Sequence, residues 1–100
     1  MKLSLRGVAA MLRNQWTEAQ FKDELITQAI MCGWICFYDQ KWLDFIGLRR
    51  NRLVVAELKV GNRRPSRAQE RWLAAWRLVP GAEVFVWKPH QWSEIERVLE

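Results

Sequence analysis

The chain is poor in the residues on which many metal centres and hydrolytic triads depend, with one histidine and two cysteines among 100 residues. Because His90 is the only histidine, a histidine-ligated metal nuclease and a serine–histidine hydrolase are both excluded. Cys32 and Cys36 are too few for a zinc site or a disulfide framework. We expect both to be buried, reduced thiols.

Long apolar runs are missing as well. No segment approaches the ~20 apolar residues that cross a bilayer. The first residues are interrupted by Arg6 and Gly7 and show no convincing cleavage site, which argues against a signal peptide. There is no repeat, low-complexity tract or interdomain linker either. These features predict an intracellular protein with no membrane association.

What is present fits one small basic domain. Half of the 100 residues are hydrophobic, which is enough for one modest core and leaves no room for a second domain. The 16 basic residues outnumber the 11 acidic ones, and the pI is near 9.8. This balance favours a polyanionic partner without identifying it.

The spacing of apolar and turn residues predicts the order α-β-β-β-α-β-α. A capping box of Thr17 and Gln20 begins a helix that ends at Gly33. A second helix is expected to begin at the N-cap Ser66, and a short third helix to follow Pro89. Strands are expected at residues 34–38, 42–48, 53–60 and 82–87. Residues 1–16 are expected to form an N-terminal extension to a domain at 17–100.

Seven tryptophans are unusual in so short a chain. The apolar stripe expected on the second helix consists of Ala68, Trp72, Ala75, Trp76 and Val79. Burial in the core is expected for Trp34, Trp72, Trp76 and Trp87. The places of Trp16, Trp42 and Trp92 stay open, because an exposed tryptophan could stack on bases or lie in a dimer contact.

The strand expected at 53–60 carries two charges in an apolar sequence. Side chains alternate along a strand, so Glu57 and Lys59 share one face with Leu53 and Val55. The opposite face is entirely apolar, and a strand with two largely apolar faces is typically covered on both sides. Burying the charges is costly unless they pair, bind an ion or lie where the strand opens to solvent.

The second and third strands can be aligned as a hairpin whose turn is centred between Arg50 and Asn51. In that register Asp44 faces Glu57, with Cβ atoms about 4.5–5.5 Å apart. Two carboxylates this close repel each other, so one pKa should rise unless a cation lies between them. Mg²⁺ is a natural occupant, because it prefers a few carboxylates plus water.

Two further polar residues flank this pair. Glu18 lies on the core-facing stripe of the first helix, where that stripe meets solvent. Taken alone, Glu18 is explained as a residue that complements the helix dipole, and Gln69 as the second half of a capping box with Ser66. A shared site is favoured by the whole set, which is Glu18, Asp44, Glu57, Lys59 and Gln69.

The order of a helix glutamate, a strand aspartate, Glu57-Leu58-Lys59 and Gln69 resembles the PD-(D/E)XK nuclease superfamily. More closely, residues 17–99 resemble the virus-type replication-repair nuclease domain, VRR-NUC. The likeness rests on Ala56-Glu-Leu-Lys-Val60, the basic loop after it, Ser66-Arg-Ala-Gln-Glu-Arg-Trp-Leu73, and Val86-Trp-Lys-Pro89 with Trp92. The family usually has proline before the aspartate, where this chain has Leu43.

The resemblance implies an α/β fold with a restriction-endonuclease-like α-β-β-β-α-β core, in which helices flank a central mixed sheet of four strands. It also implies hydrolysis of DNA phosphodiester bonds with Mg²⁺ or Mn²⁺. The metal ligands implied are Asp44, Glu57, the Leu58 carbonyl, and Glu18 directly or through water. Lys59 would orient or activate the attacking water, and Gln69 would support Lys59 or the nucleophile. Such a set supplies a polarised phosphoryl oxygen, a hydroxide and stabilisation of developing negative charge.

The basic loops suit a nucleic-acid substrate, because arginines contact phosphates and raise affinity without reading sequence. The candidates are Arg49, Arg50 and Arg52 at the hairpin turn, with Arg63, Arg64 and Arg67 near the second helix. A solvated surface is the alternative for each loop.

A structure-specific endonuclease that cuts flaps or junctions is favoured over a restriction enzyme, because no separate recognition domain fits in 100 residues. We expect a homodimer acting in replication, repair or recombination in a bacterial or phage-infected cell, with a replication or repair protein as a further partner. Two alternatives stay open. One is a non-catalytic nucleic-acid-binding module, and the other is a subunit of a larger DNA-processing complex.

Overall fold

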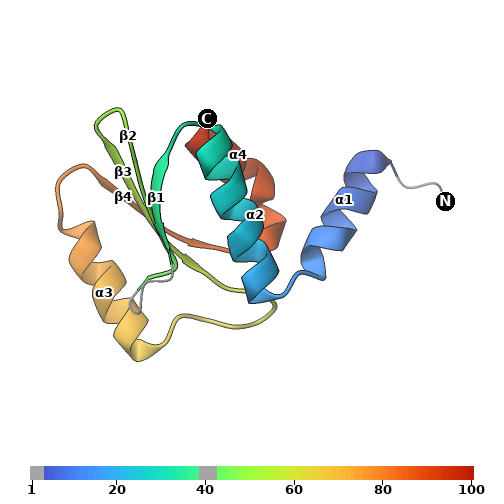
Figure 1. Cartoon of the computed structure of the whole chain (residues 1–100). Coiled ribbons are helices and arrows are strands. Elements are labelled where there is room, and N and C mark those ends of the chain that lie inside the picture. Colours follow the sequence, from blue (N-terminus) through green and yellow to red (C-terminus); the bar gives the residue numbers. More distant parts are fainter. Residues whose placement is uncertain (1–3, 39–42) are drawn as a thin grey trace.

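The computed structural model describes residues 4–38 and 43–100, in which helices flank both faces of a four-stranded sheet (Figure 1). The elements are α1 (Leu5–Asn14), α2 (Glu18–Met31), β1 (Ile35–Tyr38), β2 (Phe45–Arg49), β3 (Arg52–Leu58), α3 (Arg67–Arg77), β4 (Ala82–Trp87), the 3-10 helix η1 (Pro89–Gln91) and α4 (Trp92–Leu99). The predicted α/β class and core order are confirmed. Among the described residues, no helix has the length and apolar character needed to cross a membrane.

The sheet is mixed, with the strand order β1-β2-β3-β4. β2 pairs antiparallel with both β1 and β3, whereas β3 and β4 are parallel and are joined through α3, as a parallel pair requires. Leu48 faces Leu53 across the β2–β3 hairpin, as the predicted register requires. Arg50 and Asn51 form its two-residue turn with φ of 48° and 64°, because a type I′ turn needs positive φ at both central residues.

Local signals set the helix ends as expected. Both oxygens of the Thr17–Gln20 capping box are used: the Gln20 amide donates to the Thr17 hydroxyl at 3.2 Å, and the Thr17 amide to Gln20 Oε1 at 2.9 Å. Ser66 and Gln69 form the same pair of hydrogen bonds at the start of α3. After α2 the chain turns at Gly33, whose φ of 87° favours glycine.

Two hydrophobic clusters cover β3 on both sides. On one side α2 and α4 bury Phe21 and Ile95 against strand residues that include Val54. On the other side α3 places Leu73 against Val55 and Leu43. Figure 1 shows this division, with α2 and α4 on one face of the sheet and α3 on the other. The prediction that this strand is covered on both faces is therefore confirmed.

The predicted apolar stripe of α3 is wrong. Trp72 is 40% exposed, Ala68, Ala75 and Val79 are exposed, and Trp76 is half-buried. The buried residue of α3 is Leu73, which the stripe left out. The reason is that Gln69 points toward the end of β3, and this turns the face formed by residues 69, 73 and 76 inward.

Other expectations are met in part. Trp34 and Trp87 are buried as predicted, and so is Trp92. The cysteines are free but only half-buried. The second strand begins at Phe45, later than expected, and the predicted turn at 39–41 and Trp42 lie outside the described residues.

The N-terminal helix α1 projects from the body of the molecule (Figure 1). It has no buried residue, and Leu5 is 91% exposed. Its last turn approaches the domain where the Arg13 guanidinium lies 5.8 Å from the centroid of the Trp92 ring. α1 therefore contributes little to the core.

Candidate active site

The polar residues of the candidate site converge where β3 ends. Glu57 is 1% exposed and Lys59, just after the strand, is 8% exposed; such deep burial is rare for charged residues. Asp44 directly precedes β2, and its Oδ2 accepts a hydrogen bond of 2.9 Å from the Leu58 amide. The hairpin register continues by one position to place Asp44 opposite Glu57. Both carboxylates therefore lie at the same end of the sheet, where β2 begins and β3 ends.

Glu57 is held by a side chain of α3, the helix that packs on its face of the sheet. The Gln69 side-chain amide donates to Glu57 Oε1 at 2.8 Å, and Lys59 Nζ lies 3.4 Å from the same oxygen. The second oxygen, Oε2, is buried and has no hydrogen-bond partner among the described residues. Such an atom is costly to leave unpaired, so this carboxyl is poised for a proton or a cation.

The electrostatics of Glu57 point the same way. Burial raises its pKa, and the neighbouring Asp44 carboxylate raises it further. Lys59 opposes this shift only in part, and the pKa of Glu57 reaches about 8. Without a bound cation, Glu57 is therefore mostly protonated at neutral pH.

Glu18 joins the site from the first turn of α2. Its Oε1 is 3.8 Å from Lys59 Nζ, and its Oε2 is 3.9 Å from Arg63 Nη1. Glu18 thus lies beside Lys59, and Lys59 in turn lies beside Glu57. This geometry suits the predicted action of Glu18 through water better than direct ligation of a metal at Glu57.

Lys22 is a site residue that the sequence analysis missed. Its Nζ lies 3.7 Å from Asp44 Oδ1, and it lines a pocket of about 270 Å³ with Glu18, Ala19, Asp44 and Leu58. A signal was available, because Lys22 comes one turn after Glu18 on the same side of the helix. The sequence position of Lys22 therefore predicts a lysine near the acidic site.

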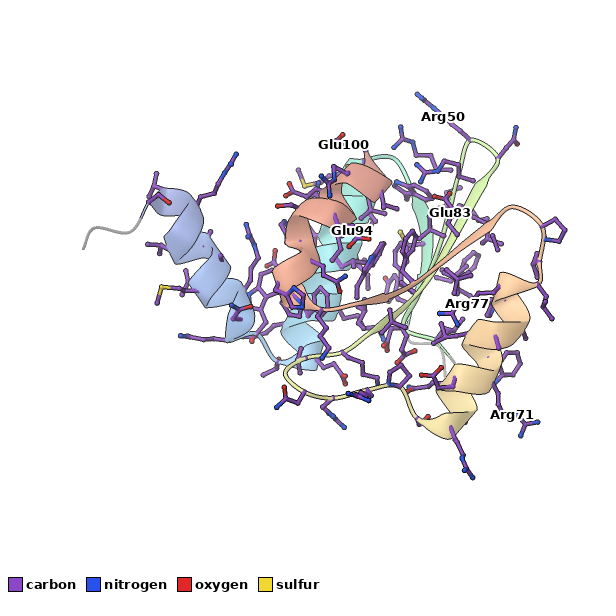
Figure 2. The ribbon with its side chains drawn as sticks, turned by 180° about the vertical axis from the view of Figure 1, so that it is seen from behind. Arg50, Arg71, Arg77, Glu83, Glu94 and Glu100 are labelled. Carbon is purple, nitrogen blue, oxygen red and sulfur yellow. The ribbon has the colours of Figure 1, made fainter. Side chains whose placement is uncertain are left out.

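The six candidate arginines fall into two groups at opposite ends of β3. Arg63, Arg64 and Arg67 follow the site-bearing end of the strand and are exposed. Arg49, Arg50 and Arg52 surround the hairpin turn, and Arg50 is labelled at its tip in Figure 2. Arg52 is five strand residues from Glu57, a separation of about 17 Å.

Two arginines of the hairpin already have partners within the fold. Arg49 donates to the Leu99 carbonyl at 3.0 Å, and Arg52 forms a bidentate pair with Glu83 at 2.8 and 2.9 Å. A hollow of about 640 Å³ also lies at this end of the strand, and neither Asp44 nor Glu57 lines it. Of the six arginines, Arg63, Arg64 and Arg67 are therefore the ones that lie near the candidate site.

A divalent cation fits the donor set in a limited way. Among residues 4–38 and 43–100, no three or more acidic, histidine or cysteine side chains are grouped so that they could hold a metal ion. Asp44 and Glu57 supply two adjacent carboxylates, and the unpaired Glu57 Oε2 needs a counter-charge. Mg²⁺ commonly binds through one or two carboxylates and keeps several waters, and carboxylate and water ligands also suit Mn²⁺. The two carboxylates therefore fit a partly hydrated Mg²⁺ or Mn²⁺ ion, and they are too few to enclose a metal ion with protein ligands alone.

Comparisons of the chain with protein-family models, with curated proteins and with solved structures gave no match.

Proposed function

We propose that this chain is a metal-dependent nuclease that hydrolyses DNA phosphodiester bonds and uses Mg²⁺ or Mn²⁺. The observation that carries the proposal is the convergence of Asp44, Glu57, Lys59 and Gln69 where β3 ends. At this point one buried oxygen of Glu57 has no hydrogen-bond partner among the described residues. The resemblance to VRR-NUC domains supports the same assignment.

Each residue has a role that its position suits. Asp44 and Glu57 would hold the metal, with the Leu58 carbonyl as a further ligand. The bound metal would polarise the phosphoryl oxygen and lower the pKa of a bound water. Lys59, fixed between Glu57 and Glu18, would orient the attacking water and stabilise the negative charge that develops on the phosphate. Gln69 would keep Glu57 in place.

The substrate side of the proposal rests on charge. The net charge of +5 and the exposed Arg63, Arg64 and Arg67 next to the site favour a nucleic acid whose backbone is contacted without sequence readout. A flap or junction substrate, a role in replication, repair or recombination, an intracellular location and a replication or repair partner all belong to this proposal.

A homodimer is proposed as the working form, and an uncovered part of the sheet supports it. α3 covers β3 and β4 on its face, but Ile35 and its strand partner Leu48 on the same face are 68% and 42% exposed. Phe37 lies beside them and is also exposed. Contiguous exposed apolar side chains commonly mark protein interfaces. Light scattering at micromolar concentration, with Leu48→Glu as the disrupting variant, checks this part.

The deciding experiment for the function is a cleavage panel. Single-stranded, duplex, flap and four-way-junction DNA are incubated with purified protein, with and without Mg²⁺ or Mn²⁺. Metal-dependent cutting that Glu57→Gln abolishes is the expected result. DNA binding with no cutting of any substrate would favour the alternative, a nucleic-acid-binding module that keeps the fold.

A further inference from the structure

The loop between β3 and α3, residues 59–66, is tied to the end of β4 by the side chain of Lys88. Its Nζ donates a hydrogen bond of 2.7 Å to the Gly61 carbonyl, 27 positions away in the chain. The two segments meet because β3 and β4 are parallel, so the chain leaves both strands at the same end of the sheet. Gly61 lies in a turn, with a φ of 57° and a hydrogen bond of 3.2 Å from the Arg63 amide to the Val60 carbonyl. Lys88 therefore holds the loop at its first turn.

The same loop carries two of the arginines to which the substrate contacts are assigned. Arg63 and Arg64 are exposed, and Arg63 Nη1 lies 3.9 Å from Glu18 Oε2 beside the candidate site. Ordering a loop and its long side chains costs conformational entropy, so arginines that are already held in place bind a phosphate at a lower cost than mobile ones. The bond to Gly61 lies two and three positions before these arginines. It therefore restricts the backbone from which they extend.

We propose that Lys88 is a positioning residue, which holds the Gly61 turn so that Arg63 and Arg64 stay beside the candidate site for the phosphates of bound DNA. This inference rests on the proposed function and adds to it a residue outside the catalytic set. A lysine suits this role because a hydrogen bond from an ammonium group is stronger than one between neutral groups. In this role Lys88 acts on DNA through the loop. A direct contact between its ammonium and a phosphate is the alternative that the test separates.

The mobility of the loop is measured without DNA, by limited digestion with trypsin, which cuts after lysine and arginine unless proline follows. Trypsin can cut between Arg63 and Arg64, whereas Pro89 follows Lys88, so substitution of Lys88 removes no cleavage site. Lys88→Met keeps the aliphatic stem and loses the donor. Because cleavage of a folded chain follows local opening, Lys88→Met should be cut after Arg63 about fivefold faster than the wild type.

Two further variants control the digestion, and thermal melts confirm that each protein is folded. Lys88→Arg can still donate to the Gly61 carbonyl, so it should be cut after Arg63 at close to the wild-type rate. Arg97→Met removes one exposed positive charge from α4 and should leave this rate unchanged. The comparison separates the loss of the bond to Gly61 from the loss of a charge.

DNA affinity is measured by fluorescence anisotropy on a short duplex, in a double-mutant cycle that combines Lys88→Met with the pair Arg63→Ala and Arg64→Ala. In the wild-type background Lys88→Met should weaken binding about threefold, because the arginines must then be ordered on binding. When both arginines have been removed, the same substitution should weaken binding no further. A lysine that itself contacts a phosphate would weaken binding equally in both backgrounds.

Equal rates of cleavage after Arg63 in the wild type and in folded Lys88→Met would overturn the proposal. An equal loss of DNA affinity in both backgrounds, or no loss in either, would overturn it as well. Failure of the nuclease function shows separately, as wild-type protein that binds DNA and cuts none, because neither readout for Lys88 depends on cutting.

Discussion

The side-chain amide nitrogen of Gln69 lies 2.8 Å from Glu57 Oε1 and so joins the first turn of α3 to the end of β3. The oxygen of the same side chain accepts a hydrogen bond of 2.8 Å from the Ser66 amide. The capping box that begins the helix therefore also holds a carboxyl group of the site. A single side chain connects the stability of α3 with the position of Glu57.

Gln69→Glu tests this double role, because it keeps the acceptor for Ser66 but replaces the donor to Glu57 with a second carboxylate. We expect the metal-free protein to lose about 1–3 kcal/mol of unfolding free energy, the cost typical of an unsatisfied buried polar group. Ser66→Ala should cost about 1 kcal/mol through the lost cap alone. Urea denaturation with and without Mg²⁺ distinguishes them, since Mg²⁺ should recover part of the loss only in Gln69→Glu. An equal response of the two variants to Mg²⁺ contradicts the link to the site.

The pKa of Glu57 predicts an unusual pH dependence of stability. Burial and Asp44 raise this pKa from 4.5 to about 8, so the folded protein binds the proton more tightly than the unfolded chain. The stabilisation is complete below about pH 4.5 and is lost as the pH rises through 8. In metal-free buffer, unfolding free energy should fall by about 1 kcal/mol per pH unit across this window.

Glu57→Gln should remove that slope, because glutamine does not titrate. Denaturation curves between pH 5 and 9 in the presence of a chelator measure it. Identical slopes in wild type and variant would show that Glu57 titrates near its ordinary value. Metal affinity should rise with pH over the same window, because a bound cation displaces the proton.

The hairpin and its carboxylate pair could be predicted because they depend on short-range rules. Side chains alternate strictly along a strand, and the turn at Arg50 and Asn51 sets the register, so the position of Asp44 opposite Glu57 followed by counting. The capping boxes at Thr17 and Ser66 could be predicted for the same reason, because each involves residues only three positions apart.

The orientation of α3 could not be predicted in the same way. Its widest apolar stripe contains Trp72, but the face that points inward contains Gln69, Leu73 and Trp76. This face is set by the hydrogen bond between Gln69 and Glu57, which are 12 positions apart, and periodicity within the helix does not reveal such a contact. The place of Lys22 beside Asp44 likewise depends on how α2 crosses the hairpin end. Contacts between distant segments, rather than local propensity, set these features.

Metal binding should stabilise the folded protein, because a ligand that binds only the native state raises the melting temperature by mass action. At a hundredfold excess over Kd, the gain is about 2.7 kcal/mol, or on the order of 10 °C for a domain of this size. Asp44→Asn and Glu57→Gln should erase the gain. The amide oxygen introduced by Asp44→Asn can still accept from the Leu58 amide, so this variant should fold.

Thermal melts with Mg²⁺, Mn²⁺ or EDTA make the measurement. Glu100→Gln removes an exposed carboxylate at the end of the chain and serves as the matched control. A metal-dependent shift that persists unchanged in both site variants would place the metal elsewhere.

Removal of residues 1–14 should leave the domain almost unchanged. α1 buries none of its residues, and its contact with the core through Arg13 and Trp92 is at most about 1 kcal/mol for a partly exposed cation–π pair. We expect the melting temperature of the truncated chain to lie within a few degrees of the full-length value, with equal cleavage in the panel. A loss of cleavage at unchanged stability would assign α1 a part in substrate or partner binding.

Chemistry and binding should separate between Lys59 and the basic loop. Lys59 is held 3.4 Å from Glu57 Oε1 and 3.8 Å from Glu18 Oε1, so its ammonium is positioned before substrate arrives. Lys59→Ala should keep metal binding and most DNA affinity, because the exposed arginines supply the phosphate contacts. Its cleavage rate should fall about a hundredfold or more, equivalent to about 3 kcal/mol of barrier.

The double variant Arg63→Ala with Arg64→Ala should show the reverse pattern. Both side chains are exposed next to the site, so their loss should weaken DNA binding and lower its salt dependence by about one to two counterions. Cleavage at saturating DNA should stay near the wild-type rate, because neither arginine contacts the carboxylate pair. Single-turnover cleavage and salt-dependent anisotropy give the two readouts. If Lys59→Ala cuts as fast as the wild type, Lys59 has no part in the chemistry and the proposed mechanism is wrong.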